Sequence, residues 1–177
     1  MSFPAGIEVG FEIYKHNHDL RVLNDGERTD YVNLPASTRY IFKTEMCQDP
    51  KAIWGLKRMG YSDPEEMELK FVSCRYGALN SSPDMVGITT KPDAPNCGEE
   101  MTRCPGFGCV CRIPDQLSRR EYLIAQLIGK GKLDKEICNM FHITIATCRT
   151  FQNRIHNKLH LNNRVEVAYW AQNLEIV

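Results

Sequence analysis

The sequence predicts a mainly α-helical protein, and three observations support this prediction. Helix-start signals recur, in which Asp or Ser stands before Pro or before an acidic first turn. Apolar residues then return at three- and four-residue spacing, as in helices that bury one face. A strand-like alternation is confined to residues 7–26. We therefore expect four C-terminal helices, preceded by a small helical domain that includes some strand.

The N-terminal part begins with a predicted hairpin and continues as helices. Residues 7–14 alternate apolar and polar side chains, and residues 19–26 supply a partner strand that ends in an Asn-Asp-Gly turn. Helices are predicted over residues 36–46, 49–60 and 62–74. The second and third of these helices begin near an Asp-Pro pair. Proline is favoured at the first position of a helix, and the aspartate before it can act as the cap.

Regular patterning stops between residues 77 and 114, where Gly, Pro, Ser and Asn dominate. A segment of this length without periodicity is either disordered or held by something other than an apolar core. We therefore divide the chain into an N-terminal domain over 1–76, a cysteine-rich connector over 77–114 and a C-terminal domain over 115–177. The break falls at Pro114-Asp115.

The C-terminal domain is predicted to be a helix-turn-helix unit with a local positive charge. Ser118 and Glu121 form a capping box before the first helix, and the third helix spans residues 145–159. No Asp or Glu occurs between Ile137 and Val165, although the net charge of the chain is zero. The same window holds Arg149, Arg154, Lys158 and Arg164, with His142, His156 and His160 beside them. This pattern predicts a nucleic-acid surface.

Several short motifs of the C-terminal domain occur together in one known family. They are LSRRE from Leu117, KEI from Lys135, the Ile143-Thr144 turn, Thr147 with Arg149, Lys158-Leu159, and NRVEVAYWA from Asn163. In this order and spacing they resemble the C-terminal DNA-binding domain of LuxR/FixJ-type (GerE-like) transcription regulators. Two positions depart from the residues usual in that family. Leu133 stands before the second helix, and Asp134 could cap that helix instead. Phe151 lies on the third helix, and we expect it to cover the core.

The resemblance implies that the third helix enters the DNA major groove. It places Arg149, Thr150 and Asn153 against base edges. Thr147, Arg154 and Lys158 become phosphate contacts, with a plain solvated face as the alternative for the last two. Double-stranded DNA and a homodimer are the implied partners, and RNA polymerase is a further candidate. The implied dimer surface lies on the fourth helix and comprises Val165, Val167, Tyr169, Trp170 and Leu174, although Trp170 could equally belong to the core.

Five cysteines in or beside the connector suggest a metal site. Cys97, Cys104, Cys109 and Cys111 precede the C-terminal domain, and Cys74 ends the third N-terminal helix. In a chain without an export signal, clustered cysteines indicate metal binding rather than disulfides. Structural zinc sites use four thiolate or imidazole ligands. The spacing lacks a compact Cys-x2-Cys pair, so an iron–sulfur cluster and plain reduced thiols remain as alternatives.

The layout of these cysteines ahead of a helix-turn-helix resembles that of a second group, small regulators of Bacteroidetes. In that group equal intervals separate three cysteines, and Cys97, Cys104 and Cys111 are equally spaced here. The resemblance implies a zinc site made of Cys74, Cys97, Cys104 and Cys111, with Cys109 as the substitute ligand.

The remaining observations narrow the functional class. The chain has no His-Glu-x-x-His motif, phosphate loop or nucleophile elbow, so we do not expect an enzyme. It also lacks an export signal and a long apolar run, so we expect a cytoplasmic, nucleoid-associated protein without a membrane partner. The leading interpretation is a sequence-specific transcription regulator whose input signal is not identified. The alternatives are a redox- or metal-responsive sensor and a protein-binding anti-repressor module.

Overall fold

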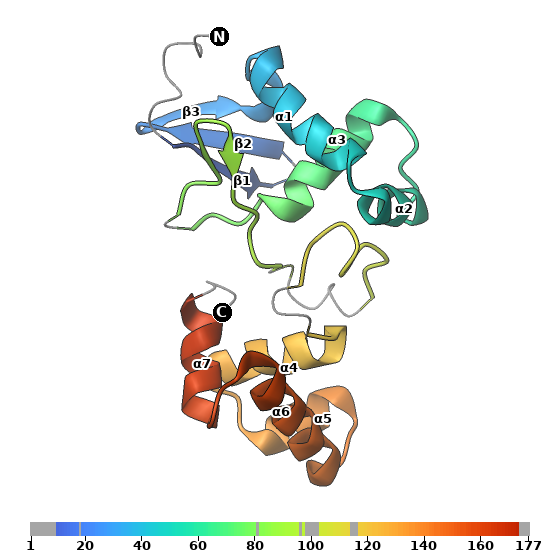
Figure 1. The fold of residues 1–177 in the computed structure, drawn as a ribbon, viewed down its shortest axis with the longest axis vertical. Helices are drawn as coiled ribbons and strands as arrows, with labels where there is room; N and C mark the ends of the chain where they lie inside the picture. The colour runs from blue at the N-terminus through green and yellow to red at the C-terminus, as the bar shows by residue number, and fades with distance from the viewer. Residues whose placement is uncertain are drawn as a thin grey trace. The chain divides into compact units, whose positions relative to one another are not determined.

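The chain forms two compact units, Met1–Arg112 and Ile113–Val177 (Figure 1). The computed structural model describes residues 10–17, 19–80, 82–95, 97, 103–113 and 117–173. Predictions made for residues 7–9, Pro114-Asp115 and Leu174 therefore lie outside the described residues. Within the described residues, the first unit combines short strands with three α-helices and the second consists of four α-helices, which confirms the predicted fold class.

A three-stranded antiparallel sheet opens the first unit. Its strands are β1 (Glu12–His16), β2 (Asp19–Asn24) and β3 (Glu27–Asp30), in the spatial order β1-β2-β3. Ile13 pairs with Val22, and both side chains are buried on the core face of the sheet. The predicted pairing of the first two strands is thus confirmed, with β1 beginning at Glu12 and extending to His16.

The third strand was missed by the sequence analysis, since its ERTD sequence has no apolar alternation. Its pairing follows from the turn that precedes it. Asp25 and Gly26 both adopt positive φ, at 49° and 82°, as a two-residue type I′ hairpin turn requires. The Asn-Asp-Gly signal therefore marked a hairpin to β3.

Three α-helices follow the sheet in the first unit. They are α1 (Ala36–Cys47), α2 (Pro50–Arg58) and α3 (Pro64–Arg75), and each contacts the other two. The side chain of Asp49 accepts a hydrogen bond from the Ala52 amide, and Asp63 caps α3 in the same way. A 3-10 turn, η1 (Tyr31–Asn33), links the sheet to α1. The Asp-Pro start signals are thus confirmed.

The core of the first unit is built around Phe42 of α1. The rings of Tyr31 and Tyr76 meet Phe42 edge-on, with centroids 6.0 and 5.0 Å away. Beside them the buried guanidinium of Arg75 donates to Glu45 Oε1, to Asp49 and to the Val110 carbonyl. Arg75 thereby connects three helices to the cysteine-rich loop.

The segment expected to lack an apolar core is packed into this same unit. It contains a short hairpin of β4 (Met85–Val86) and β5 (Thr89–Thr90). Phe11 and Met85 exchange two backbone hydrogen bonds of 3.0 and 3.2 Å. Met85 and Val110 are buried in the core cluster, so the expectation of a segment held without apolar packing was wrong for these residues.

The second unit contains α4 (Arg119–Gly129), α5 (Asp134–Phe141), α6 (Ile145–Leu159) and α7 (Arg164–Asn173). α4 packs against α6 and α7, and α5 packs against α6. The buried side chains come from all four helices and include Tyr122, Ile124, Ile128, Ile137, Ile155 and Val167. Among the described helices of both units, none is long and apolar enough to cross a membrane.

Candidate nucleic-acid interface and metal centre

The turn between α5 and α6 presents α6 as the second helix of a helix-turn-helix. His142 ends α5 in the left-handed region, with φ of 51°. Thr144 then caps α6, because its hydroxyl accepts a hydrogen bond of 3.2 Å from the Thr147 amide. No acidic residue lies in the first turn of α6, so the partial positive charge of the helix N-terminus is not offset there.

One face of α6 is buried and the opposite face is open to solvent. Cys148 and Ile155 are completely buried and attach the helix to the rest of the unit. Arg149, Thr150 and Asn153, the three residues predicted to contact bases, are all exposed. The structure therefore brings these three together on one surface, in a position from which side chains could reach into a groove.

Phe151 gathers two arginines at the edge of this surface. The guanidinium carbon of Arg154 lies 5.8 Å from the Phe151 ring centroid, and that of Arg120 lies 6.0 Å away. Phe151 is half-buried, so it shields the core with one side and supports cations with the other. Arg120 was not among the predicted contacts, because it precedes the acid-free window, although it is part of the LSRRE motif.

Lys158, predicted as a phosphate contact, forms an ion pair within the unit. Its Nζ lies 2.7 Å from Oε2 of Glu121, whose side chain is 3% exposed. Burial raises the pKa of Glu121, but hydrogen bonds from Lys158 and from the Ser118 amide outweigh it and hold the pKa below its usual value. The same carboxylate completes the predicted capping box with Ser118. Lys158 thus has a structural role that the sequence did not reveal.

Arg164 also has an acidic partner, which reduces the positive charge of the acid-free window. Its guanidinium donates to Asp134 Oδ1 at 2.5 Å and to the Lys132 carbonyl. Asp134, which also accepts from Gln152 at 2.7 Å, therefore links α5 to α6 and α7 rather than capping α5. Glu136 instead accepts from the Leu133 amide at 2.7 Å.

The predicted dimer surface on α7 is only partly exposed. Val165 and Tyr169 are 77% and 65% exposed, whereas Val167 is buried in the core of the unit. Trp170 is half-buried. An apolar surface suited to a partner is thus limited to Val165 and Tyr169 among the described residues of α7.

The cysteines predicted as ligands lie in one region of the first unit. Burial, and then the neighbouring thiols of Cys74, Cys97 and Cys104, raise the pKa of Cys111 to about 12, although the Gly108 amide opposes this by donating to its sulfur. Burial, and then the thiols of Cys97 and Cys104, raise the pKa of Cys74 to about 11, although the positive charges of Lys70 and Lys15 oppose this. Cys109 instead packs beside Gly55 of α2. The structure therefore places Cys74, Cys97, Cys104 and Cys111 near one another, with Cys109 against α2.

The four thiols are gathered but not closed around a common point. Sulfurs that share one zinc at about 2.3 Å lie roughly 3.8 Å apart. Among the described residues, no three cysteine sulfurs lie within 4.8 Å of one another. Two features of the loop nevertheless suit thiolate ligands: the Gly108 amide donates to Cys111, and the Cys104 carbonyl accepts from the Phe107 amide in a tight turn. The donor set fits zinc, and the loop would have to tighten to bind it.

Two further cysteines belong to the second unit and not to this cluster. Cys138 and Cys148 are 7% and 0% exposed, as expected for small core residues. Burial, followed by the neighbouring Cys138, raises the pKa of Cys148 to about 11, so its thiol is neutral at physiological pH. Neither thiol is suited to reaction or to metal binding.

The fold and surface of the second unit define a four-helix helix-turn-helix domain. Residues 115–171 match the family described as "Bacterial regulatory proteins, luxR family". This segment is therefore a LuxR-family domain, which confirms the resemblance seen in the sequence.

Curated relatives match the same part of the chain. The transcriptional regulatory protein LiaR of Bacillus subtilis is 36% identical over 63 residues, which cover 36% of this chain and 30% of LiaR. The response regulator protein VraR of Staphylococcus aureus is 37% identical over 57 residues, or 32% of this chain and 27% of VraR. The chain thus spans less than a third of the length of either relative. No solved structure matches.

Proposed function

We propose that this protein is a sequence-specific DNA-binding transcription regulator that places α6 in the major groove. The observation that carries the proposal is the division of α6 into two faces. Cys148 and Ile155 are buried, while Arg149, Thr150 and Asn153 project from the opposite side. The LuxR-family match and the regulatory names of the relatives support the same function.

The charged residues around α6 suggest which side chains contact the DNA phosphates. Arg120 and Arg154 both lie near the Phe151 ring, where each can reach a phosphate while the ring limits its motion. Thr147 lies at the capped N-terminus of α6, where backbone amides and the helix dipole favour an anion. Lys158 contributes mainly by holding Glu121, and through it α4, against α6.

A selection from a randomised duplex library would identify the preferred DNA site and test the proposal. Arg149→Ala should then weaken binding to that site by about 1–3 kcal/mol and relax the preference at one base position. Arg154→Ala should weaken all sequences alike and lower the salt slope by about one unit. Arg28→Ala, an exposed change on β3 in the other unit, serves as the matched control. Failure to select any site, or equal effects of all three variants, would contradict the proposal.

We further propose an assembly and a location for the regulator. Exposed Val165 and Tyr169 support a homodimer on DNA through α7. A regulator of this kind would act in the cytoplasm at the nucleoid, with RNA polymerase as a candidate partner. Sedimentation of the chain with and without its selected DNA would test the dimer, and Tyr169→Glu should prevent it.

We also propose that Cys74, Cys97, Cys104 and Cys111 hold a structural zinc ion, with Cys109 as the substitute ligand. The choice is supported because the thiols of Cys97 and Cys104 lie close enough to act on both Cys74 and Cys111. When bound, the metal would neutralise thiolates and fix the loop; the chain itself supplies the Gly108 amide and the packing of Val110. Metal analysis would identify zinc, and a visible charge-transfer band would indicate an iron–sulfur cluster instead.

A redox-responsive regulator is the second candidate function, and the exposure of the cluster favours it. Cys97 and Cys104 are half-buried, so an oxidant can reach them. Mild oxidation that releases metal and changes DNA affinity would support a sensor. Release of metal without any change in DNA affinity would leave the site purely structural.

A further inference from the structure

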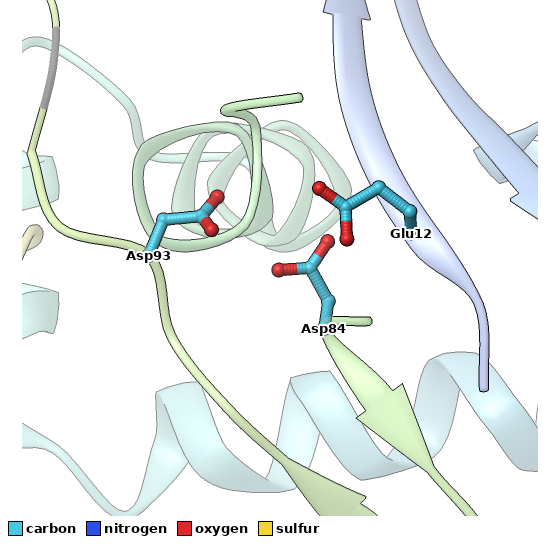
Figure 2. Close-up of side chains that lie close together, drawn as sticks. All are labelled: Glu12, Asp84 and Asp93. Atoms are coloured by element: carbon cyan, nitrogen blue, oxygen red, sulfur yellow. The ribbon is translucent and has the colours of Figure 1, made fainter. Parts of the chain in front are cut away.

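Three carboxylates that no part of the proposed function uses meet inside the first unit. Glu12 lies on β1, Asp84 immediately precedes β4, and Asp93 lies beyond β5. One oxygen from each falls within 4.8 Å of the others, the only such group of three or more His, Cys, Asp or Glu ligand atoms among the described residues. Figure 2 shows the three carboxyl groups turned toward one another from separate segments.

Two of these carboxylates are buried and Asp93 is half-buried, and all three are held in place by hydrogen bonds from elsewhere in the unit. Glu12 is 7% exposed and Asp84 is 1% exposed. The Ile13 amide donates to Asp84 Oδ2 at 2.6 Å, and the Asn80 amide donates to Glu12 Oε1 at 2.8 Å. Asp93 accepts from the Ala78 amide and from Asn80 Nδ2. Their directions are therefore fixed before any ligand arrives.

The second carboxylate oxygen of Asp84 indicates that this residue lacks a positively charged partner in the cluster. Oδ1 is buried, and no donor is hydrogen-bonded to it. Its neighbours in the cluster are carboxylates, which only accept hydrogen bonds when they are ionised. Burial, then the nearby charges of Asp93 and Glu12 and a side-chain hydrogen bond with Asp93, raise the pKa of Asp84 to about 10, although the Ile13 amide opposes this. Three ionised carboxylates are thus unfavourable here unless a positive charge lies between them.

A single proton satisfies this requirement less well than a divalent cation. A proton on Asp84 would satisfy its hydrogen bond with Asp93 but would leave the negative charges of Glu12 and Asp93 close together in a mostly buried site. A divalent cation would contact all three carboxylates and offset two of their three charges. Ca²⁺ binds oxygen at 2.3–2.6 Å, so oxygens on opposite sides of it lie about 4.8 Å apart, and it tolerates irregular ligand sets.

We propose that Glu12, Asp84 and Asp93 bind one hard divalent cation, Ca²⁺ being the best match, with water completing its coordination. The site joins β1 to the segment that leads into Cys97, so an occupied site would fasten the start of the cysteine-rich loop to the sheet. It is separate from the proposed zinc site, because hard cations prefer carboxylate oxygen and zinc in such clusters prefers thiolate.

Calorimetric titration of the full-length protein with CaCl2, and separately with MgCl2, tests the proposal directly. The expected result is one Ca²⁺ per chain, with a rise in Tm of at least about 3 °C at a hundredfold excess over Kd. Hydrogen exchange at residues 82–93 should slow when Ca²⁺ is added. Absence of both heat and thermal shift would overturn the proposal and leave Asp84 as a protonated acid.

Two variants locate the ion. Asp84→Asn keeps an acceptor for the Ile13 amide but should weaken Ca²⁺ binding at least about tenfold. Without Ca²⁺ it should be no less stable than the natural chain, since it leaves two carboxyl groups in the cluster in place of three. Glu27→Gln makes the same change of charge at an exposed position on β3 and should bind Ca²⁺ normally. If Asp84→Asn does not fold, Glu12→Gln replaces it; equal affinity in the cluster variant and in Glu27→Gln would refute the site.

Discussion

Replacing Lys158 should reveal whether this residue serves the fold or the DNA. Its ammonium is 2.7 Å from a carboxylate that is 3% exposed, while the lysine side chain itself is 40% exposed. A hydrogen bond to a charged group contributes about 1.5–3 kcal/mol, and exposure of the lysine favours the lower half of that range. We therefore expect Lys158→Met to destabilise the second unit by about 2 kcal/mol, equivalent to roughly 8–16 °C in Tm.

A double-mutant cycle separates this contact from a general effect of the substitution. Lys158→Met, Glu121→Gln and the double variant are unfolded by denaturant, and the coupling free energy should be about 1–2 kcal/mol at neutral pH. Because the pKa of Glu121 is lowered in the folded protein, its ionised form adds stability above the unfolded pKa of about 4.3. The coupling should disappear as pH falls through the lower, folded pKa.

DNA binding provides the opposing measurement. If Lys158 remains ion-paired with Glu121 when DNA binds, Lys158→Met should change the salt dependence of DNA affinity less than Arg154→Met does. Unchanged stability, together with a full one-unit loss of slope, would refute the structural role. The original expectation of a phosphate contact would then stand.

Three further outcomes can be checked separately. Cys104→Ser should release the metal and destabilise the first unit, whereas Cys138→Ser should leave the metal content unchanged; elemental analysis and thermal unfolding distinguish them. His160→Gly should stabilise the second unit by up to about 1 kcal/mol in denaturant unfolding, since His160 ends α6 with φ of 54° and glycine adopts this region without strain. A fragment over residues 113–177 should fold by circular dichroism, with lower stability and weaker DNA binding than the full chain; a fragment that stays unfolded would show that the second unit needs the first.

The helices could be predicted from sequence because their signals are local. Asp49, Asp63, Ser118 and Thr144 each cap a helix through an amide two or three residues away, and this geometry depends on the chain alone. The LuxR resemblance was equally local, since its motifs lie within one short segment. Strand β3 was missed because its side chains are mostly exposed, so burial left no pattern in them.

The parts that sequence reasoning did not reach depend on distant contacts. Glu121 and Lys158 are 37 positions apart, and nothing in either neighbourhood shows that they meet. Glu12 and Asp84 are separated further still and come together only because Phe11 pairs with Met85. For the cysteines, equal spacing singled out Cys97, Cys104 and Cys111 as candidate ligands, but spacing carries no information on how far the loop must close to bind a metal.

The position of Arg75 has a consequence for how the first unit comes apart. Its guanidinium is fully buried and depends on acceptors from α1, on the cap of α2 and on the Val110 carbonyl. If the cysteine-rich loop detached, a cation would be left in the interior short of one acceptor, next to Cys74. Local opening of the loop therefore has a high free-energy cost. The amide hydrogens of the loop should exchange together with those of the three helices, as one cooperative unit. Loss of the cysteine cluster should then destabilise the whole first unit, and no intermediate with only the loop unfolded should be populated.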